Sequence, residues 1–339
     1  MNPSSDSPRR GRRAFLGIVV IVIVLAAGLS GAWYYLAGRL DAAVDQAIEQ
    51  ARARGTEVGC PNREVFGYPF RIGIRCDAVT LDGPDNGLRA SAGALRTAAQ
   101  IYRPNRVVAE LDGPLLLDAA TVPPLDIRWS LAQASASFWT EGLDRFSLVS
   151  DGPVVALVEP ANGRQPLAEA THTETHARRR DGNLDVFGVV DSGKLVMPNA
   201  PDLPPLDATV DATIGDAADW LAGGARGQSA RVLLAGKDIA LRSLLIEMGS
   251  ANAELSGEFA FNDEGRLNGA FELAVADPDE IAKLVGTVAP DLANIAGAIA
   301  SAVPMAGRQI NGRTVIEMRA KDGILSAGIF PIGRIPELR

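Results

Sequence analysis

The stretch from Ala14 to Ala37 contains no charged side chain, and this constrains the fold more than any other feature of the chain. As an α-helix these 24 residues would be about 36 Å long at ~1.5 Å per residue, enough to cross a hydrocarbon core of about 30 Å. Four arginines precede the stretch between residues 9 and 13, and the aromatic residues Trp33, Tyr34 and Tyr35 lie near its end. Arginines before an apolar segment and aromatics at its end are typical of a transmembrane anchor with a cytoplasmic N-terminus.

A cleaved signal peptide is the alternative, with Ser30-Gly31-Ala32 as a passable cleavage site. The apolar stretch is long for a signal peptide, which favours the anchor. We therefore expect a membrane protein with a single span and with its remaining residues outside the cytoplasm. Its predicted parts are a cytoplasmic basic N-terminus (1–13), an anchor (14–37), a helical stalk (38–55) and an exported β-rich domain (56–339), with a possible internal boundary near 200–225.

The stalk is predicted from a helical stripe that continues past the apolar stretch. Leu40, Val44, Ile48 and Ala51 recur at helical spacing, and Gly55 supplies a C-terminal stop. Such a stalk would hold the following domain close to the membrane.

Charge then narrows the possible partners of the exported part. The chain has 33 basic and 41 acidic residues, and setting aside the four N-terminal arginines and Asp6 leaves 29 against 40. An acidic balance of this kind argues against nucleic acid as a partner and against electrostatic docking on anionic lipid.

Only two cysteines occur, Cys60 and Cys76, and both lie in the predicted exported part. An oxidising compartment favours a disulfide between them. Two free thiols, or half of a metal site, are the alternatives, but the two histidines of the chain are nearly a hundred residues away.

Beyond residue 58 the sequence alternates between apolar and polar residues, which predicts strands. In Phe70–Cys76 the even-numbered residues form one apolar face, while Arg71 and Arg75 point to the other. Further strand candidates are Leu88–Ile101, Arg106–Leu111, Leu115–Ala119, Leu125–Trp139, Phe146–Ser150, Val154–Val158, Leu167–Arg179, Leu184–Val190, Ser229–Leu234, Ala251–Phe261, Leu267–Val275 and Arg313–Arg319.

Asp-Gly and Asn-Gly pairs lie between or beside these candidates, and such pairs are typical of tight hairpin turns. They are found at 82–83, 86–87, 112–113, 151–152, 162–163, 181–182, 268–269, 311–312 and 322–323. Three of them extend to Asp-Gly-Pro, ending at Pro84, Pro114 and Pro153, and we interpret these as structural punctuation. We expect a mainly β domain, an extended and twisted antiparallel sheet with a few packing helices.

The predicted helices are few. Asp216–Leu221 could form a short one. A clearer helix begins at Asp277-Pro-Asp-Glu280, where Asp is a capping residue and Pro suits the first turn, and Pro290 restarts it through Val303. This pair could contact the membrane, but Asp291, Asn294 and the proline interrupt any span, so packing on the sheet is favoured.

No motif predicts a reaction. His172, Glu174 and His176 would share one face of a strand and are weak candidates for a metal site, but their surroundings are those of a solvated hairpin. The chain lacks a phosphate-binding loop, a dinucleotide fingerprint and a nucleophile elbow. We therefore expect no catalytic residues, no cofactor and no enzyme activity, with an unrecognised hydrolase as the residual alternative.

Three segments together resemble the bacterial envelope family called domain of unknown function 2125: Cys60-Pro-Asn-Arg63, Gly67-Tyr-Pro-Phe-Arg71, and residues 93–114 with their Tyr-Arg-Pro-Asn turn. The resemblance implies a single-anchor envelope protein of the bacterial inner membrane, with its β-rich domain (56–339) in the periplasm and without an assigned role. The segment Glu254–Val275 and the capped helix after it also look like parts of AsmA-like proteins. That likeness implies a long curved sheet with an apolar concave face and a role in lipid movement.

Two functions follow as expectations. An apolar sheet face that stays uncovered would bind or conduct lipid, whereas a face filled by the helices near 277–303 would leave a scaffold that binds envelope proteins. The state of that face separates the two.

Overall fold

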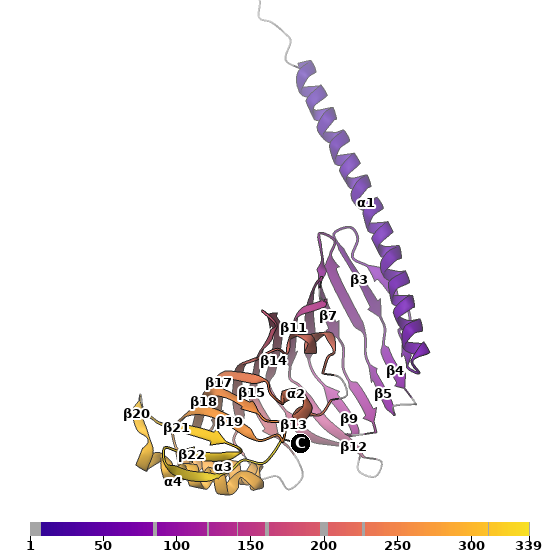
Figure 1. Cartoon of the computed structure of the whole chain (residues 1–339). Helices are drawn as coiled ribbons and strands as arrows, with labels where there is room; N and C mark the ends of the chain where they lie inside the picture. The colour runs from indigo at the N-terminus through magenta and orange to yellow at the C-terminus, as the bar shows by residue number, and fades with distance from the viewer. Residues whose placement is uncertain are drawn as a thin grey trace, which may run out of the picture.

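The computed structural model describes residues 8–83, 87–120, 122–140, 142–159, 163–196, 203–225, 228–310 and 312–338. The fold is mainly β, as the alternating pattern predicts: within these residues 23 strands form one sheet, and the paired strands are antiparallel. Figure 1 shows the long helix α1 (Pro8–Ala53) at one end of this sheet, with α3 (Pro278–Val288) and α4 (Ala293–Ala306) at the other.

The sheet bends along one line into two parts, which we call the long wall and the short wall. In spatial order the long wall contains β2 (Glu64–Phe66), β3 (Arg71–Cys76), β6 (Leu95–Gln100), β7 (Arg103–Leu111), β10 (Leu131–Trp139), β11 (Gly142–Asp151), β14 (His172–Arg180), β15 (Asn183–Leu195), β16 (Leu206–Ile214), β17 (Asp238–Met248), β18 (Ala251–Phe261), β19 (Leu267–Val275), β21 (Arg313–Lys321), β22 (Ile324–Ala327) and β23 (Phe330–Arg334), with β20 (Arg308–Ile310) beside β21. The short wall contains β1 (Glu57–Gly59), β4 (Val79–Gly83), β5 (Leu88–Ala92), β8 (Leu115–Ala119), β9 (Val122–Arg128), β12 (Val154–Glu159) and β13 (Gly163–Glu169).

The chain passes repeatedly from one wall to the other at the bend. Asp112-Gly-Pro114 joins β7 to β8, and Gly152-Pro153 joins β11 to β12, so each long run of strand continues into the other wall. The interpretation of the pairs at 112–113 and 151–152 as hairpin turns is therefore wrong. Proline has no amide hydrogen for the ladder, which suits the point where one pairing partner is exchanged for another.

Hydrogen bonds from side chains stabilise these corners. The Trp129 indole Nε1 donates to the Leu111 carbonyl oxygen at 2.8 Å. The Arg96 guanidinium donates to Asp112 at 3.1 Å and to Glu110 at 3.0 Å. Those carboxylates raise the pKa of Arg96 above its ordinary value, Asp112 more than Glu110. The bend is thus held by side-chain contacts that span neighbouring strands.

Several hairpin turns lie where the sequence predicts them. Asp181 begins the turn between β14 and β15, and Asp322 begins the turn between β21 and β22; each has φ of 50°. Other assignments are wrong. Asn268-Gly269 lies inside β19, and residues 229–234 form no strand, because Ser229 caps the short helix α2 (Ala230–Leu234).

Helix α1 is continuous from the apolar stretch into the predicted stalk, and one stripe of it packs on the sheet. Leu40, Val44, Ile48 and Ala51 are half-buried, as the helical spacing predicts, and the helix contacts β1, β2 and β3. The stalk is therefore packed along one end of the domain and does not simply separate it from the membrane. Trp33 is buried, so this residue does not belong to an exposed aromatic belt, although Tyr34 and Tyr35 are exposed.

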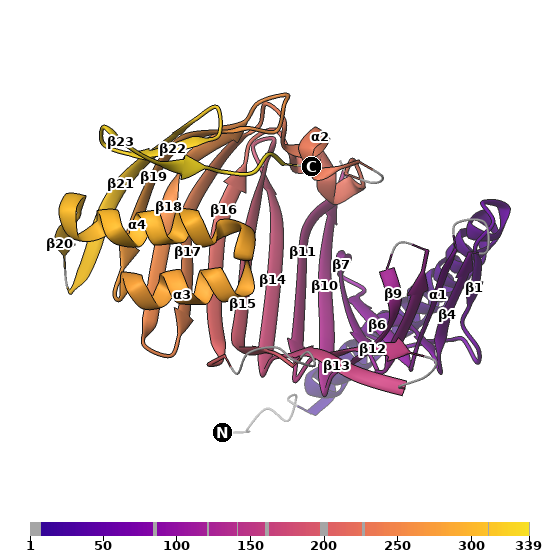
Figure 2. The same cartoon turned by 90° about the horizontal axis from the view of Figure 1, so that it is seen from below.

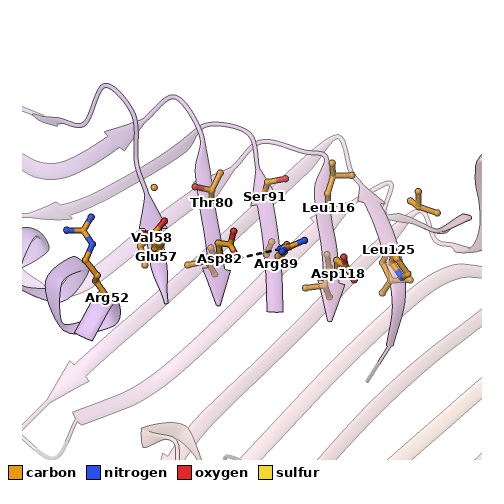
Figure 3. Close-up of a pocket in the computed structure, with 16 residues that line it drawn as sticks. Arg52, Glu57, Val58, Thr80, Asp82, Arg89, Ser91, Leu116, Asp118 and Leu125 are labelled. Carbon is orange, nitrogen blue, oxygen red and sulfur yellow. Dashed lines mark ion pairs between the residues drawn. The ribbon is translucent and has the colours of Figure 1, made fainter. Parts of the chain in front are cut away.

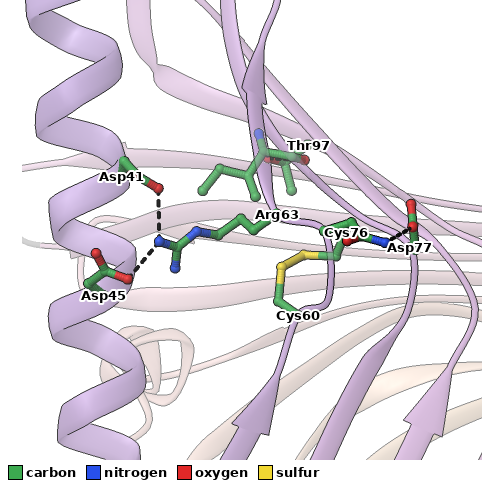
Figure 4. The surroundings of a disulfide bond; sticks show 9 residues. Asp41, Asp45, Cys60, Arg63, Cys76, Asp77 and Thr97 are labelled. Carbon is green, nitrogen blue, oxygen red and sulfur yellow. Dashed lines mark hydrogen bonds and ion pairs between the residues drawn. A yellow bond between two sulfur atoms is a disulfide. The ribbon is translucent and has the colours of Figure 1, made fainter.

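A second attachment of α1 lies at the cysteine pair. Cys60 and Cys76 are joined as the sequence predicts, with Cα atoms 5.1 Å apart. Figure 4 shows Arg63 between this disulfide and the helix, where its guanidinium is 2.9 Å from the Asp41 carboxylate and 2.6 Å from that of Asp45. The loop closed by the cysteines therefore presents the arginine that pairs with α1.

Helices α3 and α4 pack on the sheet, as predicted from Asp291, Asn294 and Pro290, which interrupt any span. Asp277 accepts a hydrogen bond from the Glu280 amide at 3.1 Å and caps α3. Pro290 begins a short 3₁₀ turn, η3 (Pro290–Leu292), before α4, while the short helix expected at 216–221 is the 3₁₀ turn η2 (Ala218–Ala222). The core between these helices and the sheet contains Val303 of α4 together with Leu267, Phe271, Val275, Ile316, Met318, Ala320, Leu325 and Ala327 of the strands.

The possible boundary near 200–225 coincides with a well-paired strand. β16 pairs with β15 on one side and with β17 on the other. Within the described residues the sheet runs through this region without a break.

Candidate functional site

One face of the long wall is uncharged across most of its width. Because strand residues alternate between faces, the register places one residue of each strand in line on the same face. We call one such line the inner row: Thr97, Ala109, Ala134, Leu148, Thr175, Gly188, Val210, Leu244, Leu255, Leu273 and Ile316. None of these residues carries a charge. We call this side of the sheet the apolar face.

The opposite side, the polar face, carries the charged residues. Its nearest line contains Arg96, Glu110, Gln133, Val149, Glu174, Val189, Thr209, Leu245 and Glu254. Ion pairs join these strands, such as Arg178 with Asp185 at 2.6 Å and Arg313 with Glu254 at 3.0 Å. The contrast between the two faces assigns the polar face to solvent and leaves the apolar face to be covered or occupied.

The short wall continues the apolar face around the bend. Its corresponding line is Val58, Leu81, Ala90, Leu117, Leu125 and Leu157. Where the walls meet, a cavity of about 330 Å³ is lined from both sides, by Val155 and Ala168 of the short wall and by Val190 and Leu206 of the long wall. The two apolar surfaces therefore face into one angle, which we call the trough.

Helices α3 and α4 cover the trough at its C-terminal end. A cavity of about 370 Å³ remains between α3, α4 and the sheet, and Leu255, Phe271, Ile281 and Ile295 are among its apolar lining residues. Beneath the helices Ile316 is 1% exposed, whereas Leu148 and Ile246, further along the apolar face, are 40% and 38% exposed. Figure 2 shows α3 and α4 across the strands at one end and not over β10, β11 or β14, while the short turn η2 contacts β11, β14 and β15.

The uncovered part of the trough is long. It extends from β6 to β17, eight neighbouring strands. At about 4.8 Å between strands this length is roughly 34 Å. One leaflet of a membrane has a hydrocarbon depth of about 15 Å, half of a ~30 Å core. The trough therefore has the length and the chemistry for an extended hydrocarbon chain.

A larger hollow, of about 550 Å³, lies on the polar face of the short wall (Figure 3). Arg52 of α1, Asp82, Arg89 and Asp118 line it, and Arg89 pairs with Asp82 at 3.5 Å. Its charged groups of both signs lie on exposed strands. Volume alone would favour this hollow, and its lining includes the exposed apolar residues Leu116 and Val158, but the trough is the better candidate because its inner row carries no charge.

The histidine pair lies on the polar face, away from the trough. Glu174 stands between the two imidazoles, with one oxygen 3.0 Å from His172 Nε2 and the other 2.9 Å from His176 Nε2. The second ring nitrogens also have partners: His172 Nδ1 is 2.6 Å from Asp151 Oδ1, and His176 Nδ1 is 2.9 Å from Ser147 Oγ. Strand alternation brings the three candidates together as predicted.

These hydrogen bonds control the charge of the cluster. Asp151 and then Glu174 raise the pKa of His172, because each stabilises the imidazolium. His176 and His172 in turn lower the pKa of Glu174. Among the described residues no group of three or more His, Cys, Asp and Glu side chains is arranged to hold a metal ion. The cluster links β11 to β14 through hydrogen bonds.

Strands β16 and β17 supply part of the trough and were missed in the sequence. Leu206, Ala208, Val210, Ala212 and Ile214 alternate with polar residues, which is a usable strand signal. Alternation alone does not show which strand faces meet across the bend. That depends on the corners between the walls, and in the sequence these corners resemble hairpin turns.

Residues 33–336 match a bacterial family whose description is "uncharacterized protein conserved in bacteria", domain of unknown function 2125. The match covers most of the chain, which therefore belongs to this family, as the Cys-Pro-Asn-Arg and Tyr-Arg-Pro-Asn segments predict. No curated protein shows a significant match to the sequence.

Proposed function

We propose that this member of the domain of unknown function 2125 family is a non-catalytic, membrane-anchored protein that binds lipid in the trough. The supporting observation is the uncovered apolar face between β6 and β17, which an acyl chain would fill. Burying hydrocarbon there stabilises a complex by about 25 cal/mol per Å² of apolar surface removed from water.

The anchor in this proposal is the first half of α1. One helix of the described chain is long and apolar enough to span a membrane, and a signal sequence would have the same properties. Most side chains from Phe15 to Leu25 are exposed, and this part of the helix lies beyond the sheet in Figure 1. We propose that this segment spans the bacterial inner membrane and that the arginines before it keep the N-terminus in the cytoplasm. The β domain then lies in the periplasm.

A charge placed in the trough tests lipid binding. Leu148→Glu puts a carboxylate in the middle of the inner row, where a bound chain would have to desolvate it. Val108→Glu is the matched control, because Val108 is also exposed but lies on the polar face. Each variant is purified from membranes as the full chain, and co-purified lipid is measured by mass spectrometry against the unchanged protein.

The expected result is a large loss of lipid with Leu148→Glu and little change with Val108→Glu. Absence of lipid from the unchanged protein, together with recovery of an envelope protein by crosslinking, would favour a partner-binding scaffold. Equal lipid in all three samples would mean that the lipid is bound to α1 alone.

A further inference from the structure

The loops and the end of one strand on the same side of the long wall carry exposed aromatic side chains. These loops follow β2, β6 and β10, and the strand register places them side by side at the end opposite the bend. Phe70 is 62% exposed, Tyr102 70% and Trp139 70%. We call Tyr68, Phe70, Tyr102 and Trp139 the aromatic tips. Exposed aromatic residues gathered in this way indicate an interaction surface.

Contacts with α1 place the first of these tips along the helix. The Tyr68 hydroxyl is 2.8 Å from the Ser30 hydroxyl, and its ring stacks edge-on against Trp33 with ring centres 5.5 Å apart. Trp33 also donates from Nε1 to the Arg71 carbonyl oxygen at 2.7 Å. The loop from Tyr68 to Arg71 is therefore level with residues 30–33 of α1.

This level coincides with the end of the proposed membrane span. A span that begins at Ala14 and needs about 20 residues ends near Trp33. In Figure 1 the tip of β3 lies beside α1, and the N-terminal part of the helix continues beyond the sheet. The loop with Tyr68 and Phe70 thus lies at the depth where tyrosine and tryptophan are favoured, between headgroups and hydrocarbon, and Tyr102 lies beside it because the Ile101 amide donates to the Phe70 carbonyl oxygen at 3.1 Å.

The charged residues near the aromatic tips also suit a membrane surface. Arg71, Arg103 and Arg106 are exposed and form no ion pair with any residue that the structure describes. The chain as a whole is acidic, so this local group of arginines differs from its average surface. Arginines beside aromatic residues would contact lipid phosphates while the rings enter the interface.

We propose that the aromatic tips insert into the outer leaflet of the anchoring membrane and hold the β6 end of the trough against the bilayer. The proposal rests on α1 as the anchor and not on lipid binding in the trough. It assigns the membrane surface as the partner of the tips.

Site-directed spin labelling of the full chain tests this directly. Because the native cysteines form a disulfide, a single added cysteine carries the label. Labels are placed at Phe70, Tyr102, Val22 and Phe330, the last an exposed aromatic at the far end of the sheet. The protein is reconstituted in nanodiscs of phosphatidylethanolamine and phosphatidylglycerol, and collisions with oxygen and with a water-soluble nickel chelate are compared.

Oxygen collisions should exceed nickel collisions at residues 22, 70 and 102, and the order should invert at residue 330. If residue 22 is in lipid and residues 70 and 102 behave like residue 330, the inference is overturned while the anchor stands. If residue 22 is also in water, the anchor itself fails. A second measurement places the label at Asn105 and compares two variants. The label should move towards water in the double variant F70S/Y102S and should not move in the control F330S.

Discussion

At the scale of single residues, Asp185 is an acidic side chain that the fold buries and compensates. It accepts from Arg178 at 2.6 Å and from the Thr213 hydroxyl at 2.7 Å, and Arg180 lies 3.3 Å away. Burial raises the pKa of Asp185, but these hydrogen bonds and positive charges outweigh burial, so the pKa lies below its ordinary 3.8. The polar face thus depends on carboxylates that remain ionised.

Asp185→Asn should lower the free energy of unfolding by about 1–2 kcal/mol, since a charged hydrogen bond is lost but the arginine partners are half-exposed. Because the folded pKa lies below the unfolded one, the contribution is present above pH 3.8 and is lost as the pH falls through the folded value. The difference between variant and parent in urea unfolding should therefore shrink in acid. Asp181→Asn, in an exposed turn with positive φ, is the control and should change stability by less than ~0.5 kcal/mol.

His172 gives the opposite dependence on pH. Its pKa lies above 6.5 through Asp151 and Glu174, so its stabilising contribution is complete below pH 6.5 and is lost as the pH rises through the folded value. Asp151→Asn should lower the pKa of His172 towards 6.5, as measured by NMR titration of the imidazole. An unchanged titration would contradict the hydrogen bond, and D181N serves as the control.

At the scale of elements, the glycine Gly73 in a strand and the glycine Gly297 in a helix have different structural roles. Gly73 in β3 lies so close to the neighbouring strand that an added Cβ would be 1.7 Å from the Thr97 carbonyl oxygen. Gly297 in α4 has nothing within 4 Å of the same position. One glycine is required by a close approach between strands, and the other is not.

Gly73→Ala should therefore destabilise the chain by on the order of 2–3 kcal/mol, because the backbone of β6 must shift. Gly297→Ala should stabilise it by about 0.5–1 kcal/mol, since alanine is the better helix former. Thermal unfolding of both variants in one detergent measures the difference. Equal effects would show that β3 and β6 do not approach as closely as described.

The elements that the sequence predicts best are those with one local cause. The strands Ala251–Phe261 and Leu267–Val275 follow from alternation alone and have the predicted bounds. The helix after Asp277 follows from its cap. Residues 229–234 were misassigned because a short apolar run suits a strand or a helix, and there the Ser229 cap decided the outcome.

At the scale of the whole molecule, the trough depends on where the chain bends, and this was not predictable from local patterns. Asp112-Gly-Pro114 has the composition of a hairpin turn, yet it carries one strand from the long wall to the short wall. Such a corner is distinguished from a hairpin turn only by its strand pairing: β7 pairs with β6 and β10, whereas β8 pairs with β5 and β9. The existence of an apolar face was readable in the sequence, while its shape required the long-range register.

A block in the middle of the trough tests whether the apolar face acts as one continuous surface. Gly188 lies in the inner row between Thr175 and Val210, and an added Cβ there would be 3.2 Å from the Val210 side chain. Gly188→Phe should therefore project a ring into the trough with a small local shift. Val189→Phe is the matched control, because the next residue of β15 points to the polar face.

The full-length variants are reconstituted with a photoreactive phospholipid, and the crosslinked peptides are mapped by mass spectrometry. If lipid enters at the end beside α1 and extends towards α3 and α4, G188F should leave crosslinks in β10 and β11 and remove most of those in β17. V189F should preserve both groups. Loss of both groups of crosslinks in G188F would mean that lipid binds as a single unit centred on β15. Unchanged crosslinks in β17 would mean that lipid reaches the covered end without passing along the inner row.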